Sequence, residues 1–352
     1  MKLINLSILF TIGMFLISCS KEDSNNDSNS GVANPDTEVD TPIVEQIEVL
    51  NLIKWEIIAE TPVEKFDAHI VHGNKLFSLS NQSTYEFDFE SANWTLLATD
   101  TENVLPNISY STKVNFIRNG KWNMFTERGL FVFDFELNNW SVIKEFPQSN
   151  GIFATAGFYA NEDNAIYFVD NSNGNDTIYK FDLVTNELLL HGEYVNVGDR
   201  GSTYNGSLVV NNSFYHVKPA NGTGTSDKIS ISKFNDNFTN LNSINELITE
   251  NDLDGSVAIN YGNYIIFGLG GVPSSDANGM ITSDSTTLKF YSYDVINNVF
   301  TEMPTPFYES CWGAEIVVFN NEFYLINGRT IKNQQGEARN KIEKIEFDFI
   351  TL

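Results

Sequence analysis

The stretch "LFVFDFELNNW", Leu130 to Trp140, repeats a phrase that stands 46 residues earlier as "TYEFDFESANW", Thr84 to Trp94. In both copies apolar residues alternate ahead of an aspartate, Asp134 or Asp88, and a tryptophan follows six residues later. Alternation with a period of two is typical of a half-buried strand. An aspartate with asparagines just after it is typical of a tight turn. The phrase therefore predicts a β-hairpin.

The same frame recurs along the chain. Further copies place the aspartate at Asp182 and Asp294, a degenerate copy has Ser232 followed by Phe238, and a last copy ends in Asp348. An asparagine after each aspartate is expected to adopt the left-handed conformation that closes the turn. These residues are Asn93, Asn139, Asn186, Asn237 and Asn298.

A second hairpin precedes each copy, as in "HIVHGNKLFSLS" and "EIVVFNNEFYLING". Two hairpins make a four-stranded unit of roughly 50 residues, and six such units predict a six-bladed β-propeller. The last copy stops at Leu352, before its aromatic position, while "KWEII" around Trp55 matches the strands that begin at Trp94 and Trp140. The sequence therefore predicts an all-β propeller over residues 47–352, closed by an N-terminal strand in the last blade.

The glycines of two units resemble the kelch family of propellers. "IIFGLGG", Ile265 to Gly271, keeps the paired glycines of the kelch pattern, and "LINGR" keeps one, whereas the other four units have lost both. The resemblance spans residues 47–352. It implies a kelch-like fold but no particular activity, because kelch propellers serve as enzymes and as binding modules.

The N-terminus is expected to be a targeting segment and not part of the fold. Residues 1–18 combine Lys2 with an apolar run and the ending "LIS" before Cys19, which predicts a secretory signal peptide. This ending resembles the bacterial lipobox, which implies a lipidated Cys19 and a stable membrane anchor. Residues 19–46 are polar and acidic, so they are expected to form a disordered tether. Their acidic cluster resembles the surface-export signal of Bacteroidetes lipoproteins, which implies outer-membrane surface display; a periplasm-facing protein is the alternative.

The composition argues against a nucleic-acid partner, a disulfide and a metal site. A formal net charge of −25 repels nucleic acid, so no nucleic-acid partner is expected. With Cys19 lipidated, Cys311 has no disulfide partner in the chain and is expected to be a small buried residue. His69 and His72 lie three apart on a predicted strand and point to opposite faces, so they cannot hold one metal ion. Neither a metal nor another cofactor is expected.

The ligand site is expected on the face that carries the loops between the second and third strands. Three of these loops are long, at 217–228, 268–287 and 327–341, and long loops on a rigid scaffold commonly form binding sites. Residues opening the innermost strands should line the channel mouth there. The predicted ligand-binding residues are Arg200, Tyr204, Tyr308, Glu309, Trp312 and His69, and the other rim candidates are Phe66, Asp67, Tyr110, Lys113, Phe153, Asp252 and Asp254.

Three functions are compatible with these features. The first is a non-enzymatic binding protein for a glycan or a protein, since no Gly-x-Ser-x-Gly elbow or Gly-rich phosphate loop is present. The second is an enzyme resembling the kelch-type sialic acid mutarotases, which implies Arg200 as carboxylate ligand and Glu309 or Asp254 in acid–base catalysis. The third is a scaffold in an outer-membrane complex.

Overall fold

The computed structural model describes residues 48–106, 114–146, 154–170, 176–194, 203–204, 206–220, 227–249, 253, 255–271, 274–275, 280–283, 287–304 and 311–351. All described elements are β-strands, and they belong to one compact unit, Gln46–Leu352. The predicted signal peptide, Cys19 and the tether lie outside the described residues.

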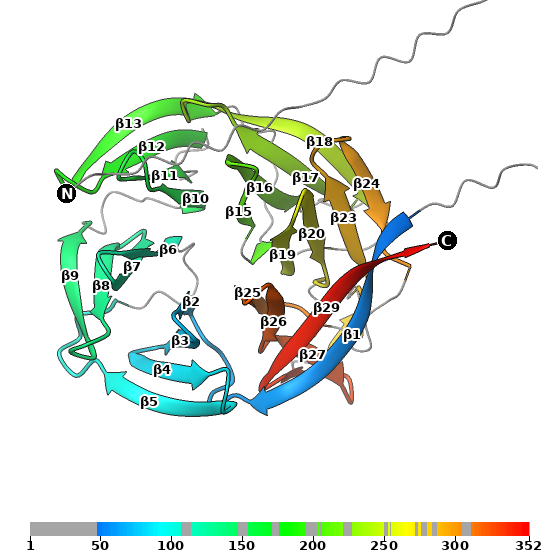
Figure 1. Ribbon diagram of the computed structural model, residues 1–352, viewed down its shortest axis with the longest axis horizontal. Coiled ribbons are helices and arrows are strands. Elements are labelled where there is room, and N and C mark those ends of the chain that lie inside the picture. Colours follow the sequence, from blue (N-terminus) through cyan, green and yellow to red (C-terminus); the bar gives the residue numbers. More distant parts are fainter. Residues whose placement is uncertain are drawn as a thin grey trace, which may run out of the picture. The chain divides into compact units, whose positions relative to one another are not determined.

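Six antiparallel sheets form a ring (Figure 1). The first blade comprises β2 (Ala68–His72), β3 (Lys75–Ser80), β4 (Ser83–Asp88) and β5 (Asn93–Thr99). The second comprises β6 (Val114–Arg118), β7 (Lys121–Thr126), β8 (Gly129–Asp134) and β9 (Asn139–Glu145). The third comprises β10 (Ala154–Ala160), β11 (Ala165–Asp170), β12 (Asp176–Asp182) and β13 (Glu187–Tyr194).

The remaining blades follow the same order with additions. The fourth comprises β15 (Ser207–Val210), β16 (Ser213–Ala220), β17 (Asp227–Phe234) and β18 (Leu241–Thr249). The fifth comprises β19 (Ser256–Tyr261), β20 (Tyr264–Gly268), β23 (Phe290–Asp294) and β24 (Val299–Glu302), with β14 (Thr203–Tyr204) added in parallel to β19. The sixth comprises β25 (Glu315–Phe319), β26 (Glu322–Ile326), β29 (Lys341–Thr351) and β1 (Glu48–Glu60).

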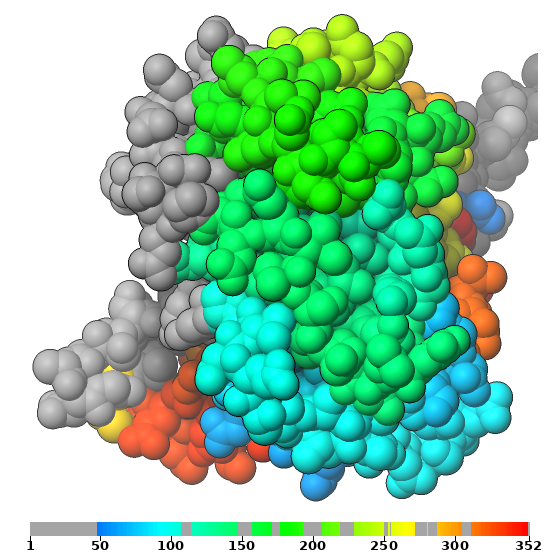
Figure 2. Space-filling model, turned by 90° about the vertical axis from the view of Figure 1, so that its left-hand side faces the viewer, coloured from blue at the N-terminus to red at the C-terminus, as the bar shows by residue number. Residues whose placement is uncertain are grey.

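The ring is closed at its centre and at its rim. The innermost strands touch in the order β2, β6, β10, β15, β19 and β25, and β25 in turn touches β2. At the rim, Figure 2 shows the first three blades, coloured from cyan to green, as a continuous wall. The predicted six-bladed β-propeller is therefore confirmed.

The core lies between neighbouring blades. Between the first and second blades, Phe77 and Leu79 of β3 pack against Trp122, Phe133 and Trp140. The second strand of a blade is buried on both of its faces, as in β11, where every residue is buried. Each blade therefore contributes one face of side chains to each of two clusters, and no blade can bury its apolar surface alone.

The aspartate of the repeated phrase caps the turn at the outer hairpin. The Asp88 Oδ1 atom accepts the N–H groups of Glu90 and Ser91 at 2.9 and 3.0 Å. The Asp182 Oδ1 atom accepts those of Val184 and Thr185 at 2.8 and 3.0 Å. Asp134 and Asp294 make the same pair of bonds. The predicted role of these four aspartates is therefore confirmed.

In the four blades whose turn begins with an aspartate, the left-handed residue stands four positions after that aspartate. Asn186 and Asn298 occupy it as predicted, with φ of 57° and 60°. In the first two blades, however, Ala92 and Asn138 occupy it, and the predicted Asn93 and Asn139 begin the next strand. In the fourth blade Phe238, not Asn237, has a positive φ. The prediction failed there because the alignment followed asparagine identity, whereas the hydrogen bonds fix the spacing.

Two copies of the phrase were placed in the wrong register. In the fourth blade Tyr215 faces Lys233 and Phe234 faces Leu241, which puts Asn235 rather than Ser232 in the aspartate position. Asn235 keeps the capping role, since its Oδ1 atom accepts the N–H of Asn240 at 3.0 Å.

The other misplaced copy is in the sixth blade. There Phe323 faces Ile345, as Leu76 faces Phe87 in the first blade, so Glu346 and not Asp348 is the equivalent residue. No turn follows it, because the partner strand comes from the other end of the chain.

The N-terminal strand closes the last blade as predicted. β1 pairs with β29 along its whole length, and Trp55 faces Ile345 just as Trp94 faces Phe87. The two strands also continue beyond their blade: Leu50 and Phe347 join a cluster with Phe290 and Met303 of the fifth blade. The two termini therefore bind two blades together, which accords with the short β24 of the fifth blade.

Replacing Leu50 with alanine should destabilise the propeller by about 2–5 kcal/mol, because Leu50 is 2% exposed within the cluster on the fifth blade. Ile53 lies on the same strand at 52% exposure, so Ile53→Ala is the matched control and should stay within about 0.5 kcal/mol of wild type. Urea unfolding measures both. Equal losses of unfolding free energy in the two variants would contradict the packing of the β1–β29 pair on the fifth blade.

The aspartate turns should weaken in acid. The pKa of Asp182 lies below its ordinary value because the N–H groups of Thr185 and Val184 stabilise the carboxylate. Its contribution to stability is therefore present above the unfolded pKa of about 3.9 and is lost as the pH falls through the folded pKa.

The Asp182→Asn variant keeps an acceptor oxygen, as Asn235 does, but cannot titrate. Between pH 6 and pH 3, its unfolding free energy should fall less steeply than that of wild type in urea titrations. Identical slopes for the two proteins would show that this carboxylate is not stabilised by the turn.

Candidate functional site

The link face is the face of the ring on which the outermost strand of one blade passes to the innermost strand of the next. The loops between second and third strands lie on it, and in the last two blades they contain small hairpins. These are β21 (Ser274–Ser275) with β22 (Ile281–Ser283), and β27 (Arg329–Lys332) with β28 (Gln335–Ala338). The Gln335 Nε2 atom lies 3.6 Å from the Met280 sulfur, so the two loops meet.

The third long loop is shorter than predicted. In the fourth blade β16 extends to Ala220 and β17 begins at Asp227, so both ends of the predicted loop 217–228 are paired strand. Loop elaboration among the described residues is therefore concentrated on the fifth and sixth blades.

His69 lies where the first and sixth blades meet near the channel mouth. Its Nδ1 atom is 2.7 Å from the Ser78 Oγ atom, and its Nε2 atom is 3.6 Å from the Glu315 Oε2 atom. Ser78 is fully buried, so it cannot attack an external substrate, whereas the Glu315 side chain is 18% exposed. The three groups therefore form a buried base and a partly open acid, without an accessible nucleophile.

Two rim candidates beside His69 are structural. Phe66 stacks on Trp94 with ring centroids 5.1 Å apart and belongs to the cluster between the sixth and first blades. The Asp67 Oδ2 atom accepts the N–H of Asn81 at 2.7 Å and so fixes the turn after β3. Phe66 also contacts the His69 ring, with ring centroids 5.2 Å apart, and both Phe66 and Asp67 are buried.

Trp312 lies beneath the hairpin of the sixth blade. Its backbone exchanges two hydrogen bonds with Arg329, at 3.2 and 2.9 Å, and a Cβ atom on Gly336 would lie 3.4 Å from its indole ring. The indole is 9% exposed, so it supports the hairpin instead of presenting an open platform. Arg329 itself is exposed and donates to the Gly336 carbonyl at 2.7 Å.

The other predicted residues are only partly located. Tyr204 lies in β14, opposite Val257 of β19, which places its backbone at the inner edge of the fifth blade. The remaining candidates lie outside the described residues: Arg200, Asp254, Tyr308, Glu309, Tyr110, Lys113, Phe153 and Asp252.

Sequence reasoning missed Glu315 and Arg329. In the sixth blade the rim was predicted at Tyr308, Glu309 and Trp312, yet the innermost strand begins only at Glu315. The apolar run "IVVF" marks the strand but not the length of the link before it. Arg329 was hidden inside a stretch interpreted as a loop, although "RTIK" and "QGEA" flank the turn residues Asn333 and Gln334, both with positive φ.

Cys311 is buried as predicted, within a polar cluster. Its sulfur accepts a hydrogen bond from Arg339 Nη1 at 2.9 Å, and Arg339 Nη2 donates to Glu343 Oε2 at 2.6 Å. The guanidinium also lies 5.4 Å from the ring centroid of Trp55. A buried ion pair that touches both termini strands is costly to break, so this cluster fixes the geometry of ring closure.

Within the described ranges, no group of three or more His, Cys, Asp or Glu side chains is placed to hold a metal ion. None of the described segments is a helix with the length and apolar character needed to cross a membrane.

Comparison with known proteins supports the fold alone. No family model matches the chain, and no curated protein matches it. Among solved structures, that of YjhT superposes with a TM-score of 0.57 at 12% sequence identity, over 80% of this chain and 99% of YjhT.

A second buried histidine, His216 of β16, has a different environment from His69. Burial, reinforced by Lys218, lowers its pKa to about 4. Its Nδ1 atom has no hydrogen-bond partner among the described residues. It is the fourth residue of its strand, where four of the other blades carry Met124, Phe168, Phe267 or Leu325 and the first carries Ser78.

His216 should make the propeller less stable as the pH falls from about 6.5 to about 4, because the unfolded chain takes up the proton and the folded chain does not. The full loss is about 3 kcal/mol. The His216→Leu variant should lose less stability over this range and exceed wild type at pH 5, as measured by urea unfolding. A wild-type slope in the variant would contradict this assignment.

Proposed function

We propose that the chain is a lipid-anchored protein of the bacterial outer membrane whose propeller binds a glycan on its link face. The contact between the loops of the fifth and sixth blades carries the proposal. It involves the hairpin that carries Arg329 and Gln335, and this hairpin belongs to the same face of the ring at which β2 and β25, the strands of His69 and Glu315, begin. Binding sites of propellers use such elaborated loops over a rigid ring.

The chemistry of this face suits a carbohydrate. Hydroxyl groups can be bound by the Glu315 carboxylate and by the Gln335 amide, and a sugar carboxylate by Arg329. Lys332 adds a second exposed cation beside Glu337 at 3.5 Å. In a chain with net charge −25, cations gathered on one hairpin favour an acidic or polyhydroxylated ligand there over a cationic one.

A glycan array probed with the Gln46–Leu352 unit, which contains every described strand, tests the proposal. Arg329→Ala should weaken the strongest signal about tenfold or more, since a charged hydrogen bond is lost. Lys144→Ala is the matched control: Lys144 is also an exposed cation, but it lies on β9. Absence of any glycan signal, or equal losses of signal in both variants, would contradict the proposal. Capture of an envelope protein instead would favour a scaffold in an outer-membrane complex.

The His69–Glu315 pair favours one alternative, a sugar-modifying enzyme that resembles the kelch-type sialic acid mutarotases. An acid–base pair 3.6 Å apart is the minimum that proton transfer at a sugar ring requires. In that case Glu315→Gln should slow anomer interconversion followed by NMR by about a hundredfold, while glycan binding persists. Interconversion at the uncatalysed rate with wild-type protein would exclude the enzyme.

A further inference from the structure

The outer junctions between blades share one design. In each of the first four blades the outermost strand carries a bulge, and the residue after the bulge is Ala98, Lys144, Gly192 or Asn245. In three junctions this position lies opposite the turn before the outermost strand of the next blade: Gly192 and Asn245 contact that turn, whereas Ala98 only lines a pocket together with it. The same structural position can therefore be compared from one junction to the next.

Two of these junctions are filled. Between the third and fourth blades, the backbone closes the gap, because a Cβ atom on Gly192 would lie 2.1 Å from the Thr239 carbonyl oxygen. The Nε2 atom of the neighbouring His191 lies 2.9 Å from the Asn237 carbonyl oxygen. Between the fourth and fifth blades, the Asn245 amide donates to the Asn298 carbonyl at 3.0 Å.

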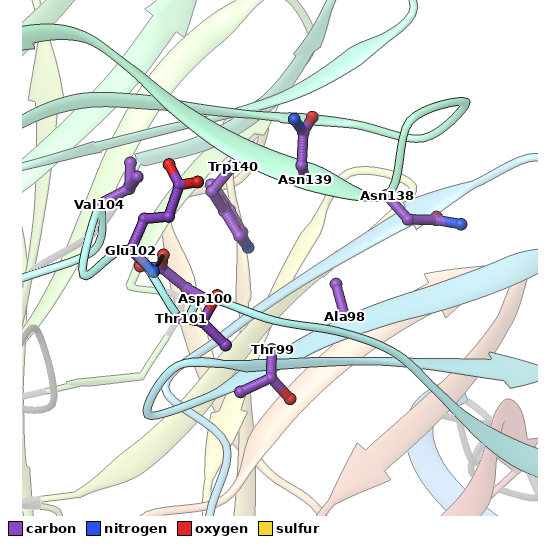
Figure 3. Close-up of a pocket in the computed structure, with 9 residues that line it drawn as sticks. All are labelled: Ala98, Thr99, Asp100, Thr101, Glu102, Val104, Asn138, Asn139 and Trp140. Carbon is purple, nitrogen blue, oxygen red and sulfur yellow. Dashed lines mark hydrogen bonds between the residues drawn. The ribbon is translucent and has the colours of Figure 1, made fainter.

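The junction between the first and second blades is open. Ala98 there is too short to bridge to the turn at Asn138 and Asn139, and a cavity of about 150 Å³ remains (Figure 3). This volume is about half the lower limit of 300 Å³ for pockets that take drug-sized ligands, so the cavity suits a group of a few heavy atoms.

The walls of this junction pocket are fixed in place. The Trp140 indole donates to Thr84 Oγ1 of the first blade at 2.8 Å, which sets the orientation of its ring. The Asp100 carboxylate accepts the N–H groups of Leu105 and Glu102 at 2.7 and 3.2 Å. The indole and the Asp100 carboxylate are therefore preorganised, and the exposed Glu102 side chain is the part that a ligand would have to order.

The lining combines negative charge with an apolar wall. Asp100 and Glu102 contribute carboxylates, and Glu102 lies beside the indole of Trp140 in Figure 3. Ala98 and Val104 are apolar, and among the described residues no Lys, Arg or His lines the pocket. Within the described part of the chain, neither carboxylate forms a salt bridge. Two carboxylates without a counter-ion next to an aromatic ring are complementary to an ammonium group.

We propose that the junction pocket binds a small organic cation, an ammonium group carried on a short carbon chain. The ammonium would lie between the carboxylates of Asp100 and Glu102, and the chain would pack against Val104 and Trp140. The same chemistry belongs to a free alkylamine and to the end of a lysine side chain of a partner. This site lies between β5 and β9 at the rim, so it is independent of the proposed glycan site.

Calorimetric titration of the Gln46–Leu352 unit with n-butylammonium chloride tests the proposal, with n-butanol as the uncharged probe. We expect saturable one-to-one binding of n-butylammonium, weakened by added NaCl, and none of n-butanol. A peptide with one lysine that binds more tightly than n-butylammonium would identify a protein side chain as the source; equal or weaker binding would identify a free amine.

Three variants locate the site. Glu102→Gln should weaken binding about tenfold or more, and Ala98→Leu, which fills the cavity, should abolish it. Glu136→Gln is the matched control, since Glu136 is exposed on the same turn as Asn138 but does not line the pocket. Wild-type affinity in both Glu102→Gln and Ala98→Leu, equal losses in Glu102→Gln and Glu136→Gln, or binding of n-butanol as tight as that of n-butylammonium would each overturn the proposal.

Discussion

The pairing of β1 with β29 is the constraint on which the rest of the ring depends. A propeller blade buries its apolar faces only between two neighbours, so an open ring would leave the first and last blades each half covered. The pairing supplies the missing outer strand of the sixth blade and carries Leu50 and Phe347 over the fifth. Arg339, held between Cys311, Glu343 and Trp55, fixes this closure through buried polar contacts.

The aspartate turn is the second element of the design, and it serves two ends. Within a blade, its hydrogen bonds set the register of the outer hairpin, as at Asp88 and Asp182. Between blades, the same turn contacts the residue that follows the bulge of the preceding blade, as at Gly192 and Asn245. Among the junctions at Ala98, Gly192 and Asn245, the one with alanine leaves a pocket, and the other two are closed by backbone or by an amide side chain.

Much of the fold could be predicted from the sequence, because period-two alternation and turn chemistry are local. Trp55 was matched to Trp94 correctly, since each stands opposite the equivalent residue of the third strand, Ile345 or Phe87. Asp348 was misplaced because nothing local distinguishes "IEFD" as the end of a strand from its continuation; the partner strand decides. The copy at Ser232 was also misplaced, because in that blade an asparagine, Asn235, accepts the hydrogen bond of the turn in place of an aspartate.

The candidate site was far less predictable. His69 was found because a rare residue opens an inner strand, yet its partner Glu315 depends on the length of a link that carries no pattern. Trp312 was predicted to bind the ligand, and only the pairing of its backbone with Arg329 shows that a hairpin covers it. The pocket beside Ala98 has no signal in the sequence, because an alanine on an exposed strand is ordinary unless its neighbour across the junction is known.

Hydrogen exchange of the backbone amides in β1 tests ring closure most directly. If β1 is an integral strand, its amides that face β29 should exchange as slowly as those of β3 and β7, which lie inside blades that need no terminus. Fast exchange throughout β1, with the second strands of the other blades still protected, would contradict closure by the N-terminal strand and with it the account of how this ring is held together.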